Sequence, residues 1–264
     1  MGVKIGIRGM GLIGGSFEKA FKKAGHEVVD LKDNSKVIPE CEVIIVCLPP
    51  LMVSPWIKEH AALFSTGAIV TDAAGVKGEV CSAIREVARG ESWSFIGGHP
   101  MAGKERSGYE NSEAELFVGA SMIFTPYEWT RKEDLEKLKS LFSEIGFSIF
   151  KITTPEKHDE MIAYTSQLAH VVSSAYIKDV LSSDHVGFSA GSFQDMTRVA
   201  TVDPDMWTDL FLSNSEELDK VLSNLIGRLF QYRDAINAKD SVTLKRLLAE
   251  GRAAKELSAQ KRPG

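Results

Sequence analysis

A glycine-rich turn near the N-terminus has the residue types and spacing that suit a dinucleotide. Gly9-Met10-Gly11-Leu12-Ile13-Gly14 fits the pattern GxGxxG. In this pattern the first glycine permits a tight turn, the second lets the backbone approach a pyrophosphate, and the third lets a helix lie close to a strand. A strand is predicted before the turn and a helix after it. The sequence therefore predicts a pyrophosphate site at the positive end of that helix, with a glycine-rich turn that binds nothing as the alternative.

The polar segment after the second predicted strand bears on which dinucleotide is bound. An acidic residue at the end of that strand would bind the ribose 2′-hydroxyl of NAD. Counting along the chain, the usual position of that acid falls on Lys32, between Asp30 and Asp33. Lys32, Ser35 and Lys36 could instead meet the 2′-phosphate of NADP. The cofactor is therefore predicted as NAD or NADP, with a slight preference for NADP, and a solvated polar loop is an equal alternative.

Two histidines and an arginine are candidates for chemistry. His99 follows a predicted strand and two glycines, at the carboxyl end of the sheet, where folds of this kind place their ligands. His170 lies in a predicted helix four residues after Ser166, so the two share a face; alone, it is more often a core histidine. Arg198 could bind a ligand or form a structural pair with Asp195. The other histidines are interpreted as surface residues: His26, His60, His158 and His185.

Strands and helices alternate over the first 150 residues. Strands are predicted at 3–8, 27–31, 42–48, 68–71, 94–96 and 147–152. Helices are predicted at 13–24, from a start at Ser54-Pro55, at 77–88, and after a capping box of Thr130 and Glu133. The run at 42–48 is apolar throughout, as expected of a strand covered on both faces. This alternation predicts an α/β fold with a doubly wound, mostly parallel sheet of the Rossmann type.

Beyond Thr154 the apolar spacing predicts helices alone. Thr154-Pro155 opens a helix that runs to about Leu181, and Asp203-Pro204 opens another. Two further helices are predicted around 218–230 and 244–248, and the polar tail after about residue 255 is expected to fray. The predicted domains are therefore a dinucleotide-binding domain at 1–153 and an all-α domain at 154–264, with part of the late apolar surface between two subunits.

Charge, hydropathy and cysteines exclude several classes of protein. The 31 basic and 36 acidic residues give a net charge of -5, which argues against a bulk nucleic-acid binder. The longest apolar stretch, 43–53, is short and interrupted by two prolines, so no membrane span is expected. The odd number of cysteines, without a CxxC pair, predicts neither a disulfide framework nor a metal site. A cytoplasmic protein fits this cysteine usage; the residues are Cys41, Cys47 and Cys81.

Five segments together resemble the prephenate/arogenate dehydrogenases of tyrosine biosynthesis. They are GMGLIGGS, TDAAGVK, GGHPMAGKERSG, HDEMIAYTSQLAH and FQDMTRVATVDPDMWTDLFLSN, and the resemblance extends over about residues 3–235. It implies a Rossmann domain followed by a helical dimerisation domain, with the active site in the cleft between them. The implied reaction is an oxidative decarboxylation, in which hydride leaves C4 of a cyclohexadienol while the ring carboxylate departs as carbon dioxide.

The resemblance also implies roles for individual residues. His99 matches the family's general base, and Arg198 matches the arginine that binds a substrate carboxylate. Further positions are implied at the substrate or at the cleft entrance: Ser166, His170, Asp195, Glu105 and Trp207. Lys77 fits the motif and is expected near the cofactor.

The chain departs from the family pattern in two places. Many members carry a serine near the catalytic histidine where this chain has Gly75, and Thr71 is one candidate to replace its hydroxyl. The segment between Leu31 and Cys41 is short, with little room for a second helix.

Arogenate stays open as the substrate. A β-hydroxyacid dehydrogenase would carry lysine and asparagine where this helix has Ser166 and His170, and a catalytically silent dinucleotide sensor is the non-enzyme alternative.

Overall fold

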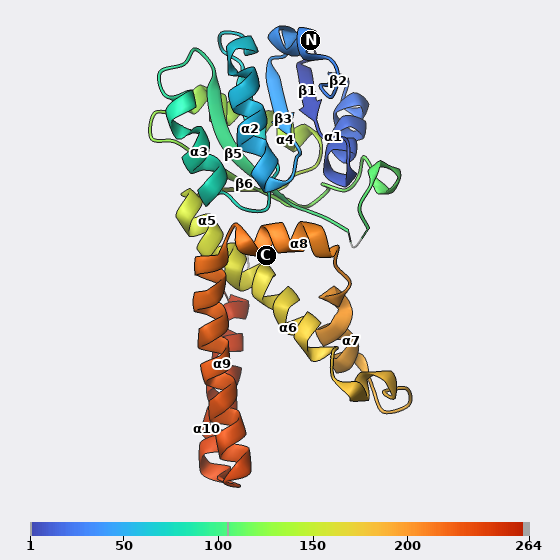
Figure 1. Ribbon diagram of the computed structural model, residues 1–264, viewed down its shortest axis with the longest axis vertical. Coiled ribbons are helices and arrows are strands. Elements are labelled where there is room, and N and C mark those ends of the chain that lie inside the picture. Colours follow the sequence, from blue (N-terminus) through green and yellow to red (C-terminus); the bar gives the residue numbers. More distant parts are fainter. Residues whose placement is uncertain (1, 105, 261–264) are drawn as a thin grey trace. The chain divides into compact units, whose positions relative to one another are not determined.

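The computed structural model describes residues 2–104 and 106–260. The chain divides into two compact units, one up to Glu217 and one from Leu218 onward. The first unit holds a sheet of seven strands in the order β2-β1-β3-β4-β5-β6-β7. Neighbouring strands are parallel except for β5 and β6, so the predicted mostly parallel sheet is confirmed (Figure 1). The strands are β1 (Lys4–Arg8), β2 (Glu27–Asp30), β3 (Val43–Val46), β4 (Ile69–Asp72), β5 (Ser94–Met101), β6 (Ser121–Pro126) and β7 (Ile149–Ile152).

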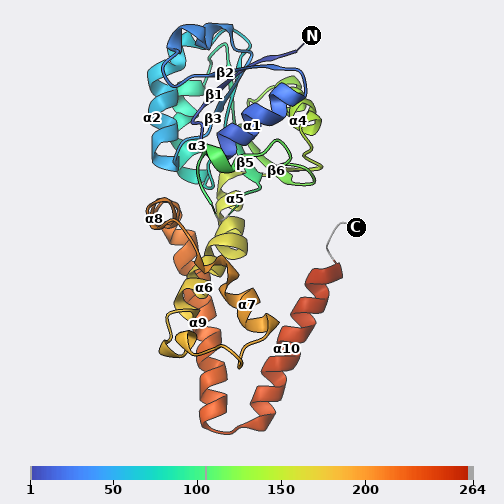
Figure 2. The ribbon, with the colours of Figure 1, turned by 90° about the vertical axis from the view of Figure 1, so that its right-hand side faces the viewer.

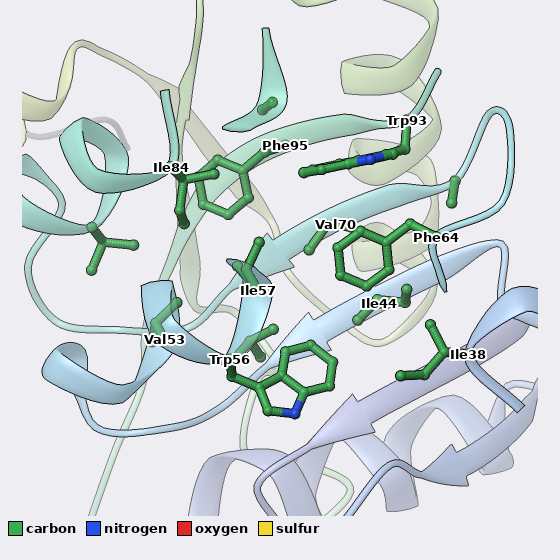
Figure 3. Close-up of a cluster of buried hydrophobic side chains, with 14 of the residues drawn as sticks. Ile38, Ile44, Val53, Trp56, Ile57, Phe64, Val70, Ile84, Trp93 and Phe95 are labelled. Atoms are coloured by element: carbon green, nitrogen blue, oxygen red, sulfur yellow. The ribbon is translucent and has the colours of Figure 1, made fainter. Parts of the chain in front are cut away.

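Helices cover both faces of the sheet. Alternate residues of β3 point to opposite faces, so Val43 and Ile45 enter one apolar cluster while Ile44 and Val46 enter the other. One cluster is closed by α1 (Leu12–Lys23) and α4 (Lys132–Glu144), and the other by α2 (Pro50–His60) and α3 (Gly78–Ala88). Figure 2 shows α1 and α2 on opposite sides of the strands, and Figure 3 shows the second cluster. The two-sided burial predicted for 42–48 is thus confirmed.

Two predicted helix starts are wrong. Helix α2 begins at Pro50, four residues before the predicted N-cap at Ser54, and Pro55 lies inside the helix. A proline fits at the first helical position because a backbone N–H there would have no acceptor within the helix, and proline lacks that N–H. The capping box is also absent: Thr130 accepts a hydrogen bond from the backbone N–H of Tyr127, and α4 begins after Arg131.

Strand β5 is longer than predicted, and this changes the position of His99. The prediction ended the strand at Ile96, but it continues to Met101 because the unpredicted strand β6 pairs with it antiparallel along that length. His99, paired in register with Ile123, therefore lies within a strand rather than after one. Strand β4 ends earlier, at Asp72, so this part of β5 extends beyond it at the carboxyl edge of the sheet.

The connection from β2 to β3 contains a short 3₁₀ turn at Ser35–Glu40 and no α-helix. The expected lack of room for a helix there is confirmed. Ile38 and Cys41 of this connection are buried against the cluster on the α2 and α3 face.

The chain after the sheet is helical, as predicted. Thr154 caps α5 (Pro155–Ile162) by accepting from the N–H of Lys157, and Asp203 caps α8 (Pro204–Leu212) by accepting from the N–H of Met206. The first predicted helix ends before Leu181: a π-helical segment (Ala163–Gln167) and α6 (Leu168–Tyr176) follow α5. Helix α7 (Gly191–Thr197) was not predicted. The two compact units divide after Glu217, and this division does not test the predicted domain boundary at 153/154. That boundary stays a prediction.

The second unit consists of most of α9 (Ser215–Asn237) and all of α10 (Ser241–Gln260). The tail predicted to fray is helical to Gln260. The hydroxyl of Tyr232 donates to the carbonyl of Leu247 across the pair. Many large apolar side chains of these helices are exposed: Ile226, Leu229, Phe230, Ile236, Val242, Leu248 and Leu257. None of the helices in the described part of the chain is long and apolar enough to cross a membrane.

Candidate active site

The glycine turn after β1 leaves free space at Gly11, on the side from which a dinucleotide would approach. A side chain at Gly9 (φ +101°) would clash with the carbonyl of Cys47, and one at Gly14 with the carbonyl of Gly9. At Gly11, by contrast, an added Cβ would meet nothing within 4 Å. Gly9 and Gly14 are therefore required by the protein's own packing, whereas Gly11 leaves free space. Helix α1 begins at this space and has no acidic residue in its first turn, so its free N–H groups fit a pyrophosphate.

The residues expected to choose between NAD and NADP lie at the end of β2. The strand ends on Asp30, so the acid and not Lys32 occupies its last position. Asp30 Oδ1 accepts from the backbone N–H of Lys32 at 2.9 Å. Lys32, Ser35 and Lys36 are exposed. An acid and two lysines are thus all available at this edge, and the slight preference for NADP stays a prediction.

A buried ion pair joins the end of β4 to the residue before α3. Lys77 and Asp72 are both fully buried, and the ammonium of Lys77 contacts Asp72 Oδ2. The same carboxylate accepts from the backbone N–H groups of Gly98 and Ala74, each at 3.0 Å. A buried charge pair of this kind is stable only when its remaining hydrogen-bonding groups are satisfied. The structure therefore places Lys77 one strand from His99, and its predicted contact with cofactor stays a prediction.

His99 is the end of a chain of three side chains. Its Nδ1 lies 2.8 Å from Nε2 of His158, and Nδ1 of His158 lies 2.6 Å from Oδ1 of Asp159. The carboxylate of Asp159 also accepts from the backbone N–H groups of Lys77, at 2.8 Å, and Gly78, at 2.7 Å. These two N–H groups are at the N-terminus of α3, so the positive end of the helix dipole faces the carboxylate.

This arrangement fixes the proton positions. An ionised Asp159 accepts only, so Nδ1 of His158 donates to it. The Nε2 of a neutral His158 is then an acceptor, and Nδ1 of His99 must donate to it. The Nε2 of a neutral His99 is left with a free lone pair.

The surroundings keep both histidines neutral. Burial lowers the pKa of His99 well below its ordinary value, and the positive charges of His158 and Lys77 would lower it further. Burial also lowers the pKa of His158, and the hydrogen bond that His158 donates to Asp159 opposes this shift. At pH 7 the free lone pair of His99 is therefore available as a proton acceptor.

The interpretation of His158 as a surface residue is wrong. Its side chain is fully buried, because α5 carries it from the first turn of the helical region back to β5. His158 and His99 are 59 residues apart in the chain, and no local pattern reports that contact. The one local signal of a role for His158 is that an acid, Asp159, directly follows it in the capped helix α5.

A row of contacts leads from His99 to the helical residues. A Cβ at Gly75 would lie 3.9 Å from Nε2 of His99 and 3.0 Å from Cδ2 of Leu210 in α8. Trp207, one turn earlier in α8, has its ring centre 3.7 Å from that of His170. His170 Nδ1 in turn donates to the carbonyl of Val199 at 2.9 Å. A serine in place of Gly75 would thus reach His99, whereas Thr71 lies within β4 with its hydroxyl buried and unpaired among the described residues.

The other candidate substrate residues lie on the neighbouring helical segments. Arg198 is exposed and precedes Val199, and its charge adds to the burial that lowers the pKa of His170. Ser166 is half-buried in the π-helical segment, one turn before His170, and Asp195 is exposed in α7, one turn before Arg198. Glu105 lies outside the described residues. The roles of these residues stay predictions.

Two buried amides, which no sequence pattern had marked as functional, hold these segments together. Gln167 donates to the carbonyl of Leu210 at 2.8 Å, and Asn214 donates to Oε1 of Gln167 at 2.8 Å. Asn214 also donates to the backbone carbonyl of Asp159 at 3.0 Å. The amides therefore link α8 to the helix that carries His158.

The open glycine turn and the neutral histidine at the same edge of a Rossmann-type sheet define a nicotinamide-dependent dehydrogenase with a helical second part. The model of the prephenate dehydrogenase nucleotide-binding domain matches residues 8–151, and that of the prephenate dehydrogenase dimerization domain matches residues 154–250. The chain therefore belongs to the prephenate dehydrogenase family and is an NAD(P)-dependent dehydrogenase.

Individual relatives agree with this placement. The chain is 28% identical to a prephenate dehydrogenase of Lactococcus lactis, over 94% of this chain and 75% of that one. It is 29% identical to a cyclohexadienyl dehydrogenase of Zymomonas mobilis, over 89% of each. Among solved structures, Synechocystis arogenate dehydrogenase has a TM-score of 0.81 at 28% identity, over 97% of this chain and 99% of that one. Aquifex aeolicus prephenate dehydrogenase, in complex with hydroxyphenyl propionate and NAD+, has a TM-score of 0.81 at 26% identity, over 97% and 98%.

The lowered pKa values of His99, His158 and His170 predict how stability depends on pH. Below about pH 6.5 these histidines take up protons in the unfolded chain before they do so in the fold. The free energy of unfolding is therefore expected to fall between about pH 7.5 and 5.5, by up to about 1.4 kcal/mol per pH unit for each histidine. Urea titrations followed by circular dichroism measure it. The change should be smaller in His158→Gln, and equal or greater wild-type stability at the lower pH would contradict the account.

Proposed function

We propose that the chain catalyses the oxidative decarboxylation of prephenate to 4-hydroxyphenylpyruvate, with hydride transfer to NAD or NADP, in tyrosine biosynthesis. The observation that carries the proposal is the free lone pair on Nε2 of a neutral His99, supported by His158 and Asp159. Loss of a hydride from a carbinol carbon requires the hydroxyl proton to leave with it, and a neutral imidazole is suited to accept that proton at pH 7.

In the proposed mechanism, Nε2 of His99 takes the proton from the C4 hydroxyl of the substrate. A bound nicotinamide supplies the hydride acceptor. As His99 becomes positively charged, its Nδ1–H donates more strongly to His158, and the carboxylate of Asp159 stabilises the charge through that ring. The ring carboxylate leaves as carbon dioxide, and its electron pair completes the aromatic ring. These electrons leave the C4 oxygen negatively charged, and it takes the proton back from His99, so that the phenol forms with no net release of a proton.

The helical residues are proposed to bind the substrate. Arg198 presents a guanidinium fork that can bind a carboxylate with two parallel hydrogen bonds. Trp207 and His170 form one wall, because their rings are in contact and Trp207 shares a helix with Leu210 beside Gly75. Ser166 and Asp195 are proposed to contact the substrate or to orient Arg198, and Lys77 to lie near the cofactor.

Arogenate is the second candidate substrate. One solved relative is an arogenate dehydrogenase, with a TM-score of 0.81 and 28% identity. Arogenate carries an amino acid side chain where prephenate carries a keto acid, so the groups on which His99 would act are the same in both. Both compounds therefore belong in the same assay.

Absorbance at 340 nm with prephenate or arogenate and NAD or NADP tests the proposal. Turnover is expected with at least one combination. His99→Asn should lower kcat by ~10²–10⁴ with a smaller change in KM, because a base acts mainly in the transition state. His60→Asn is the matched control, since His60 bonds to the carbonyl of Trp56 and stacks on its ring within α2, away from His99; its kcat should be unchanged. Folded protein that binds nucleotide without turnover in any combination would favour the sensor.

The chain is further proposed to be a cytoplasmic homodimer that joins through its late helices. Leu229 and Phe230 of α9 are 56% and 48% exposed, and this apolar surface needs a partner. The matched dimerization-domain model ends at residue 250, within α10. Cys41 and Cys81 are buried free thiols, as expected in a reducing compartment.

Sedimentation equilibrium is expected to give the mass of two chains. A double substitution, Leu229→Lys with Phe230→Glu, should shift the protein toward one chain, because it places charges in the proposed interface. Val118→Lys is the control, since it changes an apolar residue that is 68% exposed in the first unit, and it should leave the dimer intact. A wild-type monomer would refute the proposal.

A further inference from the structure

Arg8 is the last residue of β1, directly before Gly9, and the functions proposed above do not use it. Its Nε is buried and has no hydrogen-bond partner among the described residues, and no ion pair of its guanidinium is found in that part of the chain. A buried donor that lacks an acceptor is costly, and a guanidinium without a carboxylate partner attracts an anion. Arg8 is therefore suited to an acceptor from outside the described chain.

The position of Arg8 in the sheet shows where this guanidinium lies. Arg8 is paired in register with Val46, whose side chain belongs to the cluster on the α2 and α3 face. Gly6, two residues earlier and on the same face, is covered by Leu31 and Cys41. Arg8 thus follows Gly6 toward the carboxyl edge, between the glycine turn and the connection after β2. This edge is where a parallel sheet of this kind binds the adenosine half of a dinucleotide.

The acid at this edge is on the other side of the sheet. Asp30 is paired in register with Ile7, and Ile7 belongs to the cluster on the α1 and α4 face. Residues paired in register on parallel strands point to the same face, so Asp30 and Arg8 point to opposite faces. Asp30 is moreover engaged with the N–H of Lys32. It does not neutralise Arg8.

The short β2–β3 connection leaves exposed cations on the side of Arg8. A 3₁₀ turn with two exposed lysines, Lys32 and Lys36, stands where the expected helix is missing. Among the described residues, neither lysine side chain has an ion-pair partner. In the described part of the chain, three cations without carboxylate partners therefore stand at the end of β1 and on the connection that follows β2.

We propose that Arg8 binds a phosphate group of the dinucleotide, an inference that rests on the cofactor class of the proposed function. A guanidinium can bind two phosphate oxygens at once. Two phosphates are available: the diphosphate bridge, present in NAD and NADP, and the 2′-phosphate, present in NADP alone. In either case Arg8 adds a fixed positive charge to the N–H groups at the start of α1.

Equilibrium titration of the full chain with NADH and NADPH, by isothermal calorimetry, tests the proposal without turnover. Arg8→Met keeps the length of the side chain and removes the charge. It should raise Kd about 10- to 100-fold, which is the loss expected for a charge-assisted hydrogen bond. A loss confined to NADPH identifies the 2′-phosphate, and an equal loss for both nucleotides identifies the diphosphate bridge. Unchanged Kd values for both would overturn the proposal.

Two further variants make the result decisive. Arg8→Gln is neutral and hydrogen-bonding, and it decides the question if Arg8→Met does not fold; Arg8→Lys should restore part of the affinity. Arg89→Met is the matched control, because Arg89 is exposed after α3, and it should bind as the wild type does. Wild-type protein that binds both nucleotides but oxidises neither substrate would refute the proposed function and leave the role of Arg8 intact.

Discussion

The carboxylate of Asp159 is the interaction on which the site depends. Two backbone N–H groups at the start of α3 hold it, and through His158 it fixes the ring of His99 on β5. One carboxylate thus joins the sheet, a sheet-covering helix and the first helix beyond the sheet. It also decides which nitrogen of His99 has a free lone pair. Because Asn214 donates to the backbone carbonyl of Asp159 and to Gln167, the same point also positions α8 and the residues beside Gly75.

Local pattern predicted the strands and the glycine turn well, because these follow from properties that a sequence displays directly. The apolar run at 42–48 lies in a strand covered on both faces, and the caps at Thr154 and Asp203 begin helices as expected. The helix start predicted at Ser54-Pro55 was wrong because the helix already begins at Pro50. Strand β6 was missed, and with it the full length of β5, because the sequence does not display which strands pair.

The site itself could be predicted only in part. His99, His170 and Trp207 were selected; the structure places Gly75 between His99 and Leu210 and brings the rings of His170 and Trp207 into contact. His158 was not, because its burial depends on a contact 59 residues away. Arg8 was not selected for a different reason, because an arginine at the end of a strand is common. Its role is suggested only by its register with Val46 and by the lack of a hydrogen-bond partner for its Nε among the described residues. Residue types and their spacing can be recognised in a sequence. The residue that a given side chain contacts depends on the fold.

Nitrogen-15 NMR of the histidine side chains at pH 7.5 tests the central claim most directly. Long-range proton–nitrogen correlations report which ring nitrogen carries the proton, and His99→Gln and His158→Gln assign the signals. We expect both His99 and His158 to be neutral, each with its proton on Nδ1 and an unprotonated Nε2. A His99 that is protonated on Nε2, or that is charged at this pH, would contradict it.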